Sequence, residues 1–167
     1  VHVIFDNIAP TATVTLSGEA VRTGSEVLVG VGAVHLTLAV SEDLPTQPTL
    51  RLEKSDGSLL DLPLTGTGRS FTADFTIAAA DPNGYYTLFF QGTDADGNVG
   101  TVLTSGARFY VATKPPDPIT VLTATPQADG QVALSWVPPA VGDAFLTTYG
   151  NLVFRVYRDN GPFTTPT

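Results

Sequence analysis

The sequence contains no cysteine, only two histidines, and half as many basic as acidic residues. Without cysteine there is no disulfide and no thiolate chemistry, so packing alone must hold the fold unless a metal contributes. Eight Lys and Arg against sixteen Asp and Glu give a formal net charge of −8, which repels phosphate backbones and anionic lipid surfaces. We therefore expect no nucleic acid among the partners of this protein.

Long apolar runs are also missing. The longest, Val27 to Val34 with its glycines, is too short to span a membrane, so we expect no membrane insertion, and no signal peptide is visible. The chain begins with Val rather than Met, which favours a processed protein or a piece of a longer one. A cysteine-free chain of this kind fits a bacterial exported protein, and we expect an extracellular or cell-surface location.

What the 167 residues do contain is typical of short strands separated by turns. Hydrophobic residues make up 43% of the chain, which is ample for a buried core, and 16 Gly and 13 Pro accompany abundant Thr and Val. No segment keeps an apolar face at helical spacing for long. The composition predicts an all-β fold, with antiparallel strands in two packed sheets.

The stretch from Gly84 to Asn98 is the clearest strand. Tyr86, Leu88 and Phe90 alternate with more polar neighbours, and an Asp-Gly turn follows closely. The spacing Gly-x-Tyr-x-Leu resembles the F strand of immunoglobulin-like domains, in which a tyrosine hydroxyl reaches back to the backbone of the preceding corner. The resemblance implies a central strand of a sandwich.

Alternation places about seven strands between residues 11 and 111. They are expected near 11–16, 34–40, 49–53, 59–64 (a short irregular edge), 71–77, 84–91 and 107–111. The same alternation predicts that nine side chains are mostly buried: Val34, Leu36, Leu38, Phe71, Phe75, Tyr86, Leu88, Phe90 and Phe109.

Two similar junctions, each a strand followed by prolines and a new strand, divide the chain. We expect residues 1–5 to end a preceding domain, residues 6–113 to form one sandwich, residues 114–118 to be a Pro-rich linker, and residues 119–167 to begin a second sandwich. Strands are expected in this second unit at 119–124, 131–136 and 152–156, with Trp136 as a core residue rather than a platform for stacking sugars.

The two units resemble different families. Asp6-Asn7-Ile8-Ala9-Pro10-Thr11, Val40-Ser41-Glu42 and Gly92-Thr93-Asp94-Ala95-Asp96-Gly97-Asn98 resemble bacterial immunoglobulin-like repeats of secreted and surface proteins, which serve mostly as spacers, stalks and adhesive modules. The stretch Leu134-Ser135-Trp136 with Pro138-Pro139, followed by Phe154-Arg155-Val156-Tyr157-Arg158, resembles the first half of a fibronectin type III domain. The resemblance implies tandem sandwiches, the second of them incomplete.

Acidic residues from three segments are expected to meet at one end of the first sandwich, because the strand topology returns each segment there. The candidates are Asp6, Glu42, Asp43, Asp94, Asp96 and Asn98. Hard oxygen ligands from several loops are what Ca²⁺ prefers, and binding would stiffen the joint to the preceding domain. The alternative is that the Asp-Gly segment is only a turn, Asp6 caps a linker, and Glu42 solvates a strand end.

No catalytic constellation is visible in the sequence. His2 and His35 lie on separate predicted strands, without a metal-ligand spacing or a nucleophile elbow beside them. We therefore expect a non-enzymatic structural or adhesive segment, a spacer, stalk or fibre component of a bacterial extracellular multidomain protein. The alternative is an accessory module of a secreted hydrolase that binds carbohydrate or protein, with Tyr85 or Tyr110 on its binding face.

The expected partners are neighbouring domains of the same longer chain, other copies in a fibre, or a surface glycan or protein. Strands missing from the second unit would come either from the same longer polypeptide or from a neighbouring copy by strand addition.

Overall fold

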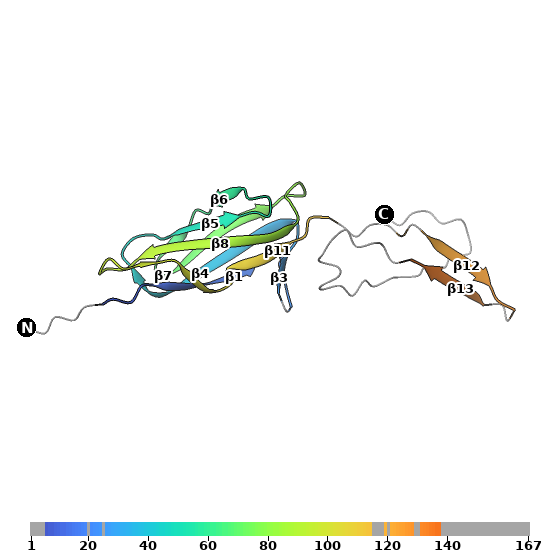
Figure 1. Ribbon diagram of the computed structural model, residues 1–167, viewed down its shortest axis with the longest axis horizontal. Coiled ribbons are helices and arrows are strands. Elements are labelled where there is room, and N and C mark those ends of the chain that lie inside the picture. Colours follow the sequence, from blue (N-terminus) through green and yellow to red (C-terminus); the bar gives the residue numbers. More distant parts are fainter. Residues whose placement is uncertain are drawn as a thin grey trace, which may run out of the picture.

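The computed structural model describes residues 6–19, 21–24, 26–114, 119, 121–128 and 131–137. All regular secondary structure in these ranges is β-strand, and two of the sheets pack face to face as a sandwich (Figure 1). The predicted all-β sandwich is thus confirmed. The described part of the chain holds no helix of the length and apolarity that a membrane span requires.

The first sheet has four strands: β1 (Thr11–Ser17), β4 (Gly32–Leu44), β7 (Thr65–Ile77) and β10 (Val102–Ser105). Their order is β10, β1, β4, β7. β4 pairs antiparallel with both β1 and β7, whereas β10 runs parallel to β1. The first and last parts of the sandwich therefore lie side by side in this sheet.

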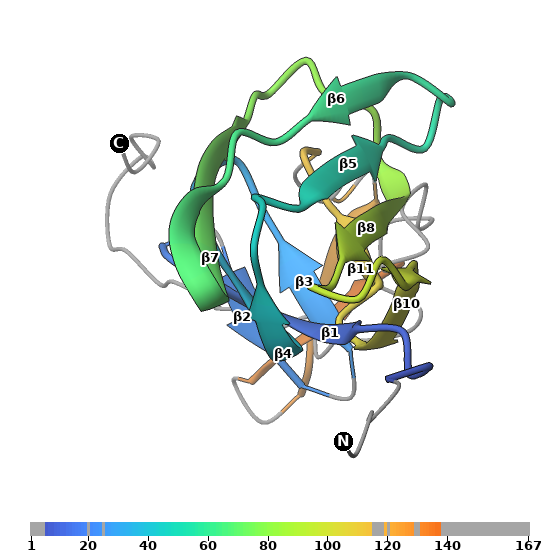
Figure 2. The same cartoon turned by 90° about the vertical axis from the view of Figure 1, so that its left-hand side faces the viewer.

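The second sheet is larger. Its strands are β2 (Val21–Thr23), β3 (Val27–Val29), β5 (Thr49–Glu53), β6 (Leu59–Asp61), β8 (Gly84–Thr93) and β11 (Arg108–Val111), with β9 (Val99–Gly100) pairing β8 beyond the main path. The order is β2, β3, β11, β8, β5, β6. The view along the sandwich shows this sheet facing β1, β4 and β7 (Figure 2).

The core lies between the two sheets and follows the predicted alternation. Val34, Leu36 and Leu38 of β4 are at most 1% exposed, and Tyr86, Leu88 and Phe90 of β8 at most 3%. Successive side chains of a strand point to opposite faces, so one face of each sheet is apolar and closes on the other. Eight of the nine side chains predicted to be buried are buried, and Phe75 is partly buried against the same core.

The tyrosine expected to tie a strand to its preceding corner does so. Tyr86 is fully buried, and its hydroxyl donates a hydrogen bond of 3.0 Å to the carbonyl oxygen of Pro82. The ring also packs against Phe109 of β11, with centroids 5.8 Å apart. This contact fixes the start of β8 against the loop that leads into it.

The strand pattern differs from the prediction in several places. β4 continues to Leu44 and β7 begins at Thr65, beyond the predicted 34–40 and 71–77. A short hairpin, β2 and β3, occupies a region for which the sequence predicted no strand, and β3 pairs parallel with β11. The predicted last strand at 107–111 is found as β11, but it is preceded by two unpredicted strands, β9 and β10, because the chain leaves β8, pairs with β1, and then returns to β8. Glycine permits this crossing: a Cβ at Gly106 would lie 2.1 Å from the carbonyl oxygen of Val14.

The second unit contributes β12 (Leu122–Pro126) and β13 (Val132–Trp136), which pair antiparallel as a separate two-stranded sheet. These strands fall where two strands of the second unit were predicted. Leu134 is exposed and Trp136 partly buried, so neither is enclosed in a core. The predicted strand at 152–156 and the predicted domain end at 1–5 lie outside the described residues, and the family assignments of both units stay predictions.

Candidate functional site

Glu42 and Asp94 extend the inward-facing rows of β4 and β8 past the apolar core. In β4, the side chains of Val40, Glu42 and Leu44 point to the same face of the sheet, and only Glu42 among them is partly rather than fully buried. In β8, Phe90 and Gly92 are buried, and Asp94 follows directly after the strand with only 4% of its surface exposed. Strand alternation therefore aims both carboxylates into the end of the space between the sheets.

Asp6 reaches the same place from the leading segment, residues 6–10. The Asn98 side-chain amide donates a hydrogen bond of 3.1 Å to the backbone carbonyl of Asp6. Four residues on, Pro10 passes so close to β9 that a Cβ on Gly100 would lie 1.7 Å from its carbonyl oxygen. The backbone amide of Thr11 donates to the Ser41 hydroxyl at 3.0 Å. The segment is thus fixed against the body before β1 begins.

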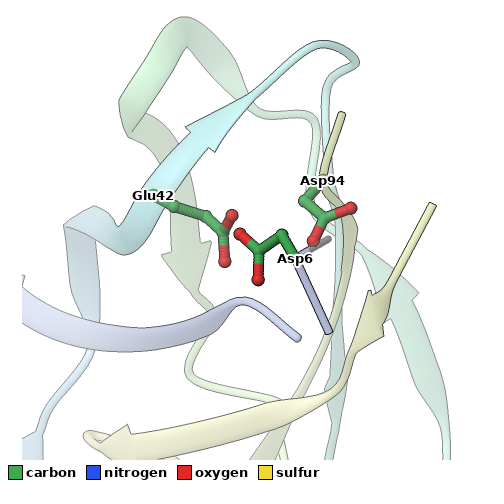
Figure 3. Close-up of side chains that lie close together, drawn as sticks. All are labelled: Asp6, Glu42 and Asp94. Carbon is green, nitrogen blue, oxygen red and sulfur yellow. The ribbon is translucent and has the colours of Figure 1, made fainter. Parts of the chain in front are cut away.

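Together these three residues form an acidic trio, Asp6, Glu42 and Asp94. Each offers one carboxylate oxygen, and these oxygens lie within 4.8 Å of one another. Figure 3 shows the three side chains turned toward a common space from three separate segments of the chain. Calcium–oxygen bonds are about 2.3–2.6 Å long, so one Ca²⁺ could contact all three oxygens without a large movement of the chain.

Asp94 is held in its charged form by donors of its own loop. Its Oδ1 accepts the backbone amides of Asp96 at 2.9 Å and Asn98 at 2.8 Å, and its Oδ2 accepts the Asn98 side-chain amide at 2.7 Å. The Asn98 side-chain bond is the largest cause of a lowered pKa at Asp94. Asp94 is therefore a preorganised anion whose position depends on Asn98.

Glu42 shows the opposite tendency. Loss of hydration raises its pKa, and repulsion from Asp94 and Asp6 raises it further, against an opposing effect of Arg69. The like charges of the trio therefore make the ionised form of Glu42 less stable than it would be in water. A divalent cation would relieve this repulsion, and a proton on Glu42 would relieve part of it.

The other residues predicted for this site have different roles. Asp43 points to the opposite face of β4 from Glu42, and its Oδ1 pairs with Nε of Arg69 at 3.0 Å. Asp96 is an exposed residue of the turn, and Asn98 acts through its amide groups, which hold Asp6 and Asp94. The structure thus brings together three of the six predicted residues, with Asn98 supporting them.

Candidates outside the acidic trio are occupied by surface interactions. His35 lies beside Asp74, Nδ1 to Oδ1 2.7 Å, as an exposed pair across β4 and β7. His2 lies outside the described residues. Tyr110 is only 7% exposed, and the ring of Tyr85 is covered by the Arg108 guanidinium, 3.4 Å from its centroid. Tyr110 is therefore enclosed, and one face of the Tyr85 ring is taken by Arg108.

Comparison with protein-family models found no match to this chain, and comparison with curated proteins found none either. The fold and the site define only a class, an all-β sandwich with a carboxylate trio at the end where the leading segment joins it.

Proposed function

We propose that this protein is a non-enzymatic structural segment, a spacer or stalk component of a bacterial extracellular multidomain protein, in which Ca²⁺ stiffens the joint before the first sandwich. The single observation that carries the proposal is the acidic trio, because Asp6 belongs to the leading segment while Glu42 and Asp94 belong to the body. A cation held by all three would bind the joint to the sandwich.

The two ends of the sandwich support a role as a spacer. The chain joins the body at one end and leaves it at the other (Figure 1). At the far end Thr113 is anchored as firmly as the leading segment: its backbone amide donates to Oδ1 of Asn83 at 2.7 Å, and its hydroxyl donates to the carbonyl of Asp81 at 2.9 Å. Chain segments held at opposite ends would fix the direction of whatever they connect.

Thermal unfolding with and without Ca²⁺ tests the proposal. A ligand that binds only the folded form adds RT ln(1 + [L]/Kd), about 2.7 kcal/mol at a hundredfold excess over Kd. We expect millimolar Ca²⁺ to raise the melting temperature, and Asp6→Asn and Glu42→Gln to abolish the increase. Asp43→Asn is the matched control, because Asp43 is a neighbouring carboxylate that pairs with Arg69 outside the trio.

Glu42→Gln has a second expected effect that separates a cation site from an ordinary surface carboxylate. Because loss of hydration and repulsion from Asp94 and Asp6 raise the pKa of Glu42, removing its charge should stabilise the cation-free protein while abolishing the response to Ca²⁺. A melting temperature unchanged by Ca²⁺, or a response that survives both Asp6→Asn and Glu42→Gln, would leave only the turn and linker-cap interpretation. Protection of residues 6–10 from proteolysis by Ca²⁺ would report the stiffening directly.

A further inference from the structure

The outer face of the second sheet carries a shallow groove of about 1100 Å³ that no part of the proposed structural role uses. It crosses β6, β5 and β8, and one row of side chains runs along it. Asp61 pairs with Arg51 across the strands, and Arg51 pairs with Phe89, so all three share this face. Phe89 is 50% exposed, more than any other aromatic residue in the described part of the chain.

The polar side chains of this row, Arg51 and Asp61, are held by an ion pair but remain accessible to solvent. Nε of Arg51 and Oδ1 of Asp61 form an ion pair of 2.7 Å, with 52% and 78% of the two side chains exposed. The Nη groups of Arg51 and Oδ2 of Asp61 take no part in that bond. Gln91 and Thr49, the next cross-strand pair on this face, add amide and hydroxyl groups to the lining. The groove therefore combines one open ring face with fixed donors and acceptors.

The backbone of the groove floor is not available for strand addition. β5 already pairs with β6 on one side and with β8 on the other, so a ligand here must be recognised by side chains. The lining is mixed: Phe89, Leu59 and Pro63 expose apolar surface beside the polar side chains of Arg51, Asp61 and Gln91. A sugar suits such a mixed surface, because it has an apolar C–H face and hydroxyl groups around its edge.

The charge of the groove limits the class of ligand further. The charged residues of the lining are Arg51, Glu53 and Asp61, a formal sum of −1, within a chain of net charge −8. Anionic polymers would be repelled, and no concentrated negative field is present to attract a polycation. From these observations we infer that the groove binds a neutral polysaccharide, with the C–H face of one sugar ring on Phe89 and hydroxyl groups bonded to Arg51 and Asp61.

The dimensions suit a short run of sugar rings. Neighbouring strands lie about 4.8 Å apart, so the row from β6 to β8 spans roughly 10 Å. The electron-rich face of an aromatic ring attracts the slightly positive C–H groups of a sugar, and the ion pair offers both donors and acceptors to adjacent hydroxyls. This activity is independent of the cation site, because none of the acidic trio lines the groove.

Affinity electrophoresis of the full chain tests the inference, in gels that contain soluble glucan, xylan, mannan or galactan, and polygalacturonate as an anionic comparison. We expect retardation by at least one neutral polymer and none by polygalacturonate. Phe89→Ala should weaken binding about tenfold or more, as loss of a central aromatic contact does. Phe89→Leu should weaken it similarly, because leucine keeps the apolar bulk without the ring. Arg51→Gln should weaken binding as well.

Two controls keep the result specific. Val102→Ala truncates an exposed hydrophobic residue of the first sheet and should leave retardation unchanged. Tyr85→Ala tests the other aromatic residue on the outer face of β8, which lies outside the groove, and should also leave retardation unchanged. Retention of a cooperative melting transition shows that each variant is folded.

Three outcomes would overturn the inference. They are no retardation of the wild-type chain by any neutral polymer, retardation that survives Phe89→Ala, and full activity of Phe89→Leu, which would indicate an apolar contact with another kind of partner. Glu42→Gln and Asp6→Asn should bind the polymer normally, so failure of the groove and failure of the cation site give different patterns.

Discussion

The hydrogen bond from Tyr86 to Pro82 is expected to contribute about 1 kcal/mol to stability at neutral pH. Tyr86→Phe removes the hydroxyl and leaves the ring against Phe109. The volume of the buried side chain hardly changes, so the loss reports the hydrogen bond rather than a cavity. Pro82 is only partly buried, and its carbonyl can regain a partner from water, which keeps the expected loss near the middle of the usual range.

The same bond predicts a pH dependence with a definite sign. Burial, with smaller effects of Asp81 and Asp56, raises the pKa of Tyr86 from 10.0 to about 12. The folded form thus keeps a proton that the unfolded chain releases. The contribution is complete below about pH 10 and is lost between roughly pH 10 and 12, by up to about 2.7 kcal/mol. The Phe variant lacks this loss, so the two stabilities should converge near pH 11 and then cross.

Urea unfolding followed by far-ultraviolet circular dichroism, from pH 7 to 11.5, measures both quantities. Fluorescence is unsuitable because the single tryptophan, Trp136, lies in β13 and not in the sandwich. Tyr85→Phe is the matched control: its hydroxyl bonds to the exposed side chain of Glu26, and its removal should change stability by less than about 0.5 kcal/mol. A difference between wild type and Tyr86→Phe that stays constant across this pH range would refute the reasoning.

Two further predictions concern the stability of the sandwich. Leu88→Ala, at a site 3% exposed in the middle of β8, should cost about 2–5 kcal/mol in urea unfolding, and a loss below 1 kcal/mol would contradict its place in the core. Asp81 pairs with Lys54 at 2.5 Å, and this bond is the main cause of the lowered pKa of Asp81. The Lys54 bond stabilises the fold at pH values above the unfolded-state pKa of Asp81, near 3.8, and this contribution is lost as the pH falls through the lower folded-state pKa. Asp81→Asn should therefore cost about 1–3 kcal/mol at pH 7 and much less in acid. An equal loss at both pH values would contradict this prediction.

The sequence predicted the regular part of this fold because strand alternation is a local signal. Val34, Leu36 and Leu38 are apolar at every second position, and only a two-sided sheet buries such a row. The β2–β3 hairpin and the strands β9 and β10 had no such signal. They depend on close backbone approaches, such as Gly106 against Val14, between segments about ninety residues apart in sequence. Local periodicity carries no information about contacts of that kind.

The predicted strand topology showed where the acidic residues would come together, but not which of them would form the acidic trio. Parity along the strand would have chosen Glu42 and rejected Asp43, since Val40 and Leu44 on either side are core residues. Parity would also have identified Phe89, because it alternates with the buried Leu88 and Phe90 and so faces outward. The contact of the Arg108 guanidinium with the Tyr85 ring could not be predicted from the sequence, because it depends on the register between β8 and β11.

The pairing of the first and last strands bears on the proposed role as a spacer. β1 runs parallel to β10, and β3 runs parallel to β11. A force applied through the leading segment and through Thr113 would pull these strands lengthwise in opposite directions. Parallel strands loaded in that way resist in shear, because their hydrogen bonds are strained together rather than one after another. A cation between Asp6 and the body would carry the load into β4 and β8 before it reached β1, and so the acidic trio would protect the junction between the leading segment and β1.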